Sequence, residues 1–150
     1  MKLSLQPATT SSLSIWQLPA LVIGDLLMLL LFVALGRISH GMTSDWLINL
    51  LRIATPFVVG WAIAALLFGL YRSHLWDMSG VFLCRSALGI VTANGFAFLL
   101  RRVLFQDRVT IPFALTSLVF TALFVLAWRL VFLALRHWLP QSPVAALSNH

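Results

Sequence analysis

Four long apolar stretches run through this chain of 150 residues, and they leave very few folds open to it. Short polar segments separate the stretches, which cover residues 18–35, 53–71, 81–100 and 110–135. A helix of about 20 apolar residues is long enough to cross the roughly 30 Å hydrocarbon core of a bilayer. Since no water reaches the backbone amides in that core, each stretch must satisfy its own hydrogen bonds as a helix. The sequence therefore predicts an all-α protein, a four-helix transmembrane bundle.

The composition excludes a water-soluble domain. Hydrophobic residues make up 61% of the chain and charged residues only 9%, whereas soluble domains carry about 25% charged residues. The length leaves room for one membrane domain, predicted over residues 18–138, between a polar N-terminal tail (1–17) and a polar C-terminal tail (139–150). Four spans place both tails on one side of the membrane, called here the terminal face; the other side is the opposite face. Basic residues divide evenly between the two faces, so the positive-inside rule predicts no orientation.

The excess of positive charge indicates lipid, not nucleic acid, as the partner. The net charge is +6, and the arginines stand mostly at the ends of the apolar stretches instead of along a water-facing stripe. Arginines in that position attract the anionic head groups of a bilayer. We therefore expect the lipid bilayer and its anionic head groups as partners, and no nucleic acid.

No pattern typical of a catalytic or metal centre occurs in the sequence. It contains no glycine-rich phosphate loop, no His-Glu-x-x-His motif and no Ser-His-Asp spacing, and its histidines are single and mostly near stretch ends. The one cysteine, Cys84, excludes a disulfide within the chain and a cysteine-rich metal site. Because Cys84 lies in an apolar stretch, we expect it to be a small, buried packing residue. We expect no enzyme activity, no cofactor and no metal.

Three charged residues lie inside the predicted spans. A lone carboxylate such as Asp25 is costly in lipid and needs a partner. From the helix rise, Asp25 lies roughly 10 Å from the terminal face, Arg85 about 6 Å and Arg129 about 9 Å. We therefore expect Asp25 to contact Arg129, Arg85 or both. The cluster is either a static clip that sets the order of the helices or a substrate, ion or proton site, unless the arginines simply extend to the interface.

A second polar cluster is predicted at the opposite face. The first and third stretches both end there, at Leu35 and Leu100. Glycines at positions 36 and 41 let the chain turn sharply after the first stretch. The basic and polar residues that emerge at these ends form a candidate anion or head-group site, with flat guanidinium forks suited to phosphate or carboxylate. Its members are Arg37, Ser39, His40, Arg101 and Arg102.

Two further features concern local structure. Residues 46–51 are predicted to form a short interfacial helix with Ser44 or Asp45 as its cap. Asn94, in the middle of the third stretch, is predicted to face away from Arg85. Polar side chains on two faces place this helix at the centre of the bundle or direct Asn94 toward a second protomer.

Several segments resemble one family of prokaryotic membrane proteins, domain of unknown function 3054. They are Gly24-Asp25, the Gly-Arg-Ile-Ser-His-Gly run over 36–41, the segment 55–61, Arg101-Arg102 and Trp128-Arg129. The resemblance implies a four-helix membrane protein of a bacterial or archaeal cytoplasmic (inner) membrane, and it assigns no role to any residue. The positions that match family motifs are Asp25, Arg37, Ser39, His40, Pro56, Trp61, Arg102 and Arg129.

Two classes of function remain open from the sequence. The first is a structural or accessory component of a membrane complex, with a second copy of the chain or another membrane protein as its partner. The alternative is a small oligomeric transporter or permeation unit that uses the cluster of Asp25, Arg85 and Arg129. It requires an oligomer, since four spans alone enclose little of a pathway.

Overall fold

The computed structural model describes residues 16–41 and 45–138, and this part of the chain is almost entirely helical without any strand. The prediction of an all-α, four-helix bundle is confirmed. The elements are α1 (Gln17–Ser39), α2 (Trp46–Phe68), the short 3-10 helix η1 (Ser73–Leu75), α3 (Ser79–Leu104) and α4 (Ile111–Trp138). The predicted polar tails lie outside the described residues, apart from Trp16 and Gln17.

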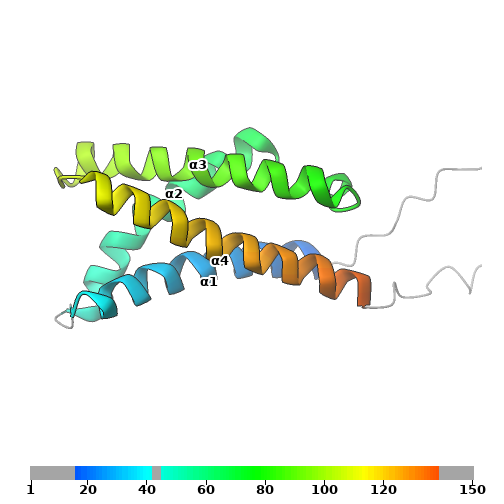
Figure 1. Ribbon diagram of the computed structural model, residues 1–150, viewed down its shortest axis with the longest axis horizontal. Helices are drawn as coiled ribbons and strands as arrows, with labels where there is room; N and C mark the ends of the chain where they lie inside the picture. Colours follow the sequence, from blue (N-terminus) through cyan, green and yellow to red (C-terminus); the bar gives the residue numbers. More distant parts are fainter. Residues whose placement is uncertain (1–15, 42–44, 139–150) are drawn as a thin grey trace, which may run out of the picture.

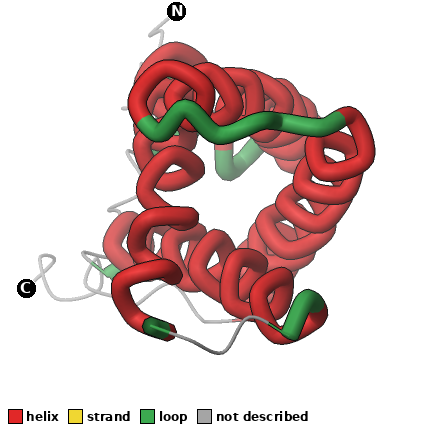
Figure 2. Tube along the Cα trace, turned by 90° about the vertical axis from the view of Figure 1, so that its left-hand side faces the viewer, coloured by secondary structure: helices red, strands yellow, loops and turns green. Residues whose placement is uncertain are grey.

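The four long helices stand at the corners of a square, and consecutive helices run in opposite directions (Figure 1, Figure 2). α1 packs against α2 and α4, and α3 packs against the same two helices, so α1 and α3 occupy diagonally opposite corners. The most extensive packing is between α2 and α3, where a Cβ atom on Gly60 would overlap the carbonyl oxygen of Ala93. A glycine is required there because small residues let two membrane helices approach closely.

The distribution of polar and apolar side chains is the reverse of that in a soluble protein. All four helices are long and apolar enough to cross a membrane. Leu27, Leu66 and Leu123 are examples of large apolar side chains on the outer surface, whereas Asp25 and Arg129 are fully buried inside the bundle. Apolar side chains outside and charges inside are what a hydrocarbon solvent favours. The protein is a multi-pass membrane protein.

The first helix is longer than predicted. It continues past Leu35 through Gly36 and ends only at Ser39, before Gly41 turns into the left-handed conformation (φ +66°). A glycine inside a helix costs about 1 kcal/mol relative to alanine, which is less than the cost of leaving backbone groups unpaired near lipid. Gly36 is therefore no stop signal, whereas Gly41 is.

The second helix begins earlier than predicted. The expected interfacial helix over residues 46–51 forms the first turns of α2, which runs without a break through Pro56. Asp45 precedes it in a left-handed conformation (φ +43°) and makes no side-chain cap bond, so the prediction of an Asp45 cap is wrong. The alternative cap, Ser44, lies outside the described residues.

The end of α2 is set by a glycine. The helix stops at Phe68, before the predicted Tyr71, because Gly69 adopts the left-handed conformation (φ +58°). The N–H of Leu70 then bonds back to the carbonyl of Ala65 at 3.0 Å, which is the usual pattern at such a helix end. Tyr71 thereby leaves the helix and turns toward the interior of the bundle.

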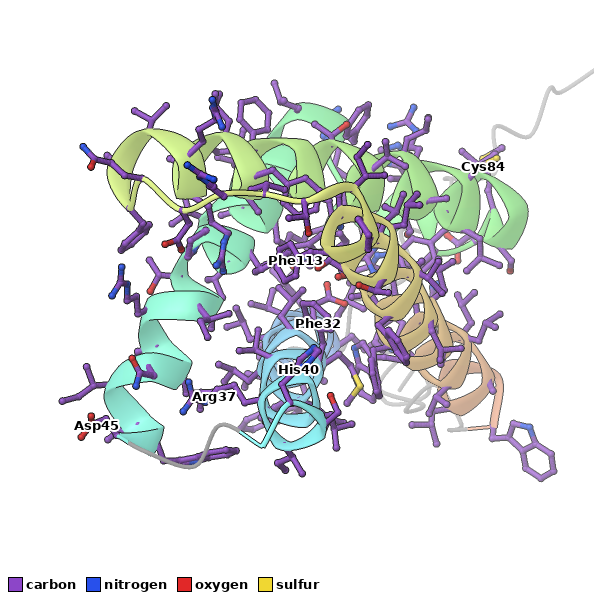
Figure 3. All side chains as sticks on the ribbon, turned by 60° about the vertical axis from the view of Figure 1, so that its left-hand side comes forward. Phe32, Arg37, His40, Asp45, Cys84 and Phe113 are labelled. Carbon is purple, nitrogen blue, oxygen red and sulfur yellow. The ribbon has the colours of Figure 1, made fainter. Side chains whose placement is uncertain are left out.

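Cys84 is exposed on the outer surface of α3, so the prediction of a buried packing residue is wrong (Figure 3). An apolar stretch in a soluble protein is buried by the protein itself, but here lipid covers most of it. A small, weakly polar thiol is tolerated on a face that contacts hydrocarbon.

Candidate functional site

Asp25 of α1 and Arg129 of α4 form a fully buried ion pair. The Arg129 Nη2 donates to Asp25 Oδ2 at 2.7 Å, and Arg129 Nε donates to Asp25 Oδ1 at 3.2 Å. Both side chains have an exposed fraction of 0%. Two parallel bonds from one guanidinium are the strongest arrangement for such a pair. The expected contact of Asp25 with Arg129 is present in the structure.

The Asp25 carboxylate has a second donor in Tyr71. The Tyr71 hydroxyl donates to Asp25 Oδ2 at 2.9 Å, and the Trp61 indole N–H donates to the Tyr71 oxygen at 2.9 Å. Tyr71 follows the membrane-spanning helix α2, and burial, followed by the charge of Asp25, raises the pKa of its hydroxyl above the ordinary value. The hydroxyl therefore stays protonated and remains a hydrogen-bond donor.

The remaining side of the Arg129 guanidinium faces α3 and three aromatic rings. Arg129 Nη1 donates to Ser86 Oγ at 2.7 Å, and this hydroxyl donates onward to the carbonyl of Phe82 at 2.6 Å. The guanidinium carbon lies 5.1 Å from the ring centre of Trp61, 5.7 Å from that of Tyr71 and 4.9 Å from that of Phe82. Ring faces within about 6 Å attract a cation, especially without competing water. These contacts offset part of the cost of burying the charge.

A glycine lets α1 and α4 come close enough for the ion pair. A Cβ atom at Gly24 would overlap the indole ring of Trp128, whose N–H points at the carbonyl of Leu21 at 3.4 Å. Gly24 and Trp128 thus make the close approach of the two helices. The residues that follow them, Asp25 and Arg129, make the ion pair.

The network is closed on itself. Both oxygens of Asp25 accept, and each of the three nitrogens of Arg129 donates to a protein oxygen. Asp25, Ser86 and Arg129 belong to α1, α3 and α4, whereas Trp61 lies in α2 and Tyr71 follows α2. The network therefore joins all four corners of the bundle at one depth. Chemically, this arrangement holds helices in register and leaves no charged group directed at solvent.

The structure places Arg85 outside this network. Arg85 Nη1 donates to the carbonyl of Phe68 at 3.2 Å, at the C-terminal end of α2. There it meets the negative end of the helix dipole. The prediction named Arg129, Arg85 or both as partners of Asp25 because it rested on depth alone, and depth does not say which way a side chain points around its helix.

At the end of α1, Arg37 and Ser39 of the predicted anion site contact residues of α1 and of the start of α2. The Arg37 side chain is buried, points toward the start of α2 and lies over the ring of Trp46 at 5.4 Å (Figure 3). Ser39 Oγ donates to the carbonyl of Gly36 at 2.9 Å, within its own helix. His40 is exposed at the end of α1.

The α3 part of that site has different partners. Arg101 Nη2 pairs with Asp107 at 2.9 Å, and its guanidinium lies 5.1 Å from the ring centre of Phe113. Arg102 is exposed. Because α1 and α3 stand at opposite corners of the bundle, the structure gives no support to a joint anion site built from Arg37 and Arg102.

Comparison with known proteins supplies the family. A sequence model described as "Protein of unknown function (DUF3054)" matches residues 22–132. The chain belongs to the DUF3054 family. The matched range includes all five side chains of the buried network. No curated protein and no solved structure matches the chain.

Three members of the network in this DUF3054 protein were missed by sequence reasoning: Trp61, Tyr71 and Ser86. A signal for Tyr71 was present, since a tyrosine at the terminal-face end of the second span has the reach to meet a carboxylate at the depth of Asp25. Ser86 follows Arg85 in the sequence, and it is the Ser86 side chain that faces the interior of the bundle and meets Arg129. Trp61 was recognisable only as a residue of the family motif.

Proposed function

We propose that this DUF3054 protein is a structural or accessory component of a membrane complex and catalyses no reaction. The observation that supports the proposal is that all three side-chain nitrogens of Arg129 and both oxygens of Asp25 are bonded to the protein's own groups. A side chain that binds a substrate or transfers a proton must be able to face it. Asp25 and Arg129 have no exposed surface, and their polar atoms are bonded within the bundle.

A register-setting role accounts for the placement of these residues. Removing one member of a buried ion pair leaves an uncompensated charge, so any helix arrangement that separates Asp25 from Arg129 is strongly disfavoured. A rigid four-helix unit with an apolar exterior suits a protein that presents one fixed surface to a partner within the bilayer.

We place the protein in the cytoplasmic (inner) membrane of a bacterium or archaeon, where its partner is a second copy of the chain or another membrane protein. The resemblance to prokaryotic membrane proteins supports this location. Anionic head groups, attracted by the arginines at both faces, complete the expected environment.

Affinity purification of the full chain in mild detergent, followed by mass spectrometry, tests this function. We expect a membrane protein, or further copies of the chain, to co-purify in a fixed ratio with the wild type. Arg102→Gln removes an exposed arginine outside the network, and it should leave the ratio of partner to chain as it is in the wild type. A purified chain that has no partner, and that moves a solute across vesicle membranes in an Asp25-dependent manner, would overturn the proposal.

A second candidate, the small oligomeric transporter, is favoured by Asn94. Its side chain is buried, and Nδ2 donates to the carbonyl of Ile90 at 2.9 Å. Its Oδ1 has no hydrogen-bond partner among the described residues. Since Ser86 meets Arg129 and the two helices are antiparallel, the buried Thr121 lies at the depth of Asn94, about two turns farther in. Of the two alternatives predicted for Asn94, the one in which it faces a second protomer does not agree with its burial inside its own bundle.

The transporter candidate predicts a flux that depends on Asn94. Vesicles that contain the purified chain should release a trapped solute faster than empty vesicles, and Asn94→Leu should abolish the difference without lowering stability. Equal release by wild type, variant and empty vesicles would eliminate this candidate.

A further inference from the structure

The four acidic side chains of this protein leave two arginines of the terminal face without a carboxylate. The sequence contains four acidic residues, and the structure describes all of them. Three form ion pairs, and the fourth, Asp45, lies at the start of α2 on the opposite face. The pairs are Asp25 with Arg129, Asp77 with Arg136, and Asp107 with Arg101 and, more distantly, Arg52. Among the described residues, Arg72 and Arg85 form no ion pair.

Both arginines have a side-chain nitrogen at the C-terminal end of α2. Arg85 reaches across from α3 and donates to the carbonyl of Phe68 at 3.2 Å. The Arg72 side chain folds back over Gly69, the residue that follows Phe68. A Cβ atom added to Gly69 would lie 3.0 Å from Arg72 Nε. Two guanidinium groups therefore flank two consecutive residues of the chain.

The position of the pair corresponds to the head-group level of a bilayer. Arg85 lies about 9 Å along α3 from Ser79, its side chain is half-buried, and its length lets the charge reach the interface. Arg72 is exposed in the connection that follows α2. Cations at this level attract the anionic head groups of the bilayer.

The charge balance of the site favours an anion. The carbonyl end of α2 contributes about half a negative charge, whereas the two guanidiniums contribute two positive charges. The bond to Phe68 holds the Arg85 guanidinium in place, and the absence of a side chain at Gly69 leaves room for Arg72. Guanidinium forks suit the paired oxygens of a phosphate.

We propose that Arg72 and Arg85 bind the phosphate group of an anionic phospholipid at the terminal face. The site is separate from the buried Asp25–Arg129 network and does not depend on the accessory function proposed above. It is also distinct from the anion site predicted from the sequence, which lies at the opposite face.

Native mass spectrometry of the full chain, purified in mild detergent and mixed with phosphatidylglycerol or phosphatidylcholine, tests the site. The wild type should retain phosphatidylglycerol in preference to phosphatidylcholine. Arg72→Gln should weaken retention of phosphatidylglycerol roughly fivefold, and Arg72→Gln with Arg85→Gln more than tenfold. The control for Arg72→Gln is Arg108→Gln, which removes the same charge from an exposed arginine of the opposite face and should retain the lipid more strongly than Arg72→Gln does.

A thermal melt followed by tryptophan fluorescence shows whether each variant is folded, and Arg72→Gln leaves the Arg85 bond to Phe68 intact. Equal weakening in the control, or no weakening in either Arg72 variant, would overturn the proposal. So would retention of phosphatidylcholine as strong as that of phosphatidylglycerol. Displacement of the lipid by millimolar inorganic phosphate would assign the site to a soluble anion and overturn its assignment to lipid.

Discussion

Two aspartate–arginine pairs of this protein have similar geometry and opposite surroundings. Asp25 and Arg129 approach to 2.7 Å, and Asp107 and Arg101 to 2.9 Å. The first pair has no exposed surface, whereas the side chains of the second are 34% and 15% exposed. The first joins two helices far apart in the sequence, and the second lies within one helix end and its loop.

The difference teaches that the environment, not the distance, sets the importance of an ion pair. Near water, Asp107 and Arg101 lose little by separating, because solvent takes over both charges. Inside the bundle, neither Asp25 nor Arg129 has that option. The surrounding protein supplies what water would, through a tyrosine hydroxyl, a serine hydroxyl and three aromatic rings.

The largest effect is expected from breaking the buried pair on one side. Arg129→Met should lower the free energy of unfolding by about 3–5 kcal/mol, because it leaves the Asp25 carboxylate buried without its cation. Asp25→Leu combined with Arg129→Met should be less destabilising than Arg129→Met alone, since no charge then remains. Unfolding in detergent micelles, followed by circular dichroism, measures both. A double variant as unstable as the sum of its single variants would contradict this account.

Closing the space between α1 and α4 should have the next largest effect. Gly24→Ala introduces a methyl group that overlaps Trp128 and pushes apart the helices that carry the pair, at a cost of about 1–3 kcal/mol. Gly36→Ala in the same helix is the control, because a Cβ atom there meets nothing within 4 Å and alanine is the better helix former. Thermal unfolding of the two variants should therefore shift in opposite directions.

Removing the hydroxyl that supports the carboxylate should cost no more than Gly24→Ala. Tyr71→Phe takes one donor from Asp25 and leaves the Trp61 N–H without an acceptor, which amounts to about 1–3 kcal/mol. The tryptophan fluorescence of the folded protein should also change, as one indole loses its hydrogen bond. An unchanged melting temperature would show that the bidentate bonds to Arg129 satisfy Asp25 alone.

The smallest effect is expected at the opposite face. Asp107→Asn should change the free energy of unfolding by only about 0–1 kcal/mol, and raising the salt concentration should shrink the difference further. The same salt series should leave the cost of Arg129→Met unaltered, because salt does not screen a buried charge effectively. Equal salt dependence of the two variants would remove the distinction drawn between the pairs.

Much of the fold could be predicted from the sequence, because the bilayer imposes few solutions. The four helices and their alternating directions follow from the length of the apolar stretches. The ends were less certain: Gly36 continues a helix, whereas Gly69 ends one. Both are glycines near the end of an apolar stretch, but of the two only Gly69 adopts the left-handed conformation.

The candidate site was predictable in depth and not in direction. Asp25, Arg85 and Arg129 were predicted to lie near one level, yet of the two arginines only Arg129 turns toward Asp25. The same limit affected the opposite face, where Arg37 and Arg102 emerge at one interface from helices at opposite corners.

The sequence by itself determined the four helices and predicted a depth for each charged residue, because helix rise and hydrocarbon thickness convert residue number into depth. Only the tertiary structure decided which helices are neighbours and which way each side chain points around its axis. Those choices depend on close contacts such as Gly24 with Trp128 and Gly60 with Ala93, between residues distant in the sequence. Tyr71 and Ser86 could complete the Asp25–Arg129 network only after that packing had brought four helices to one point.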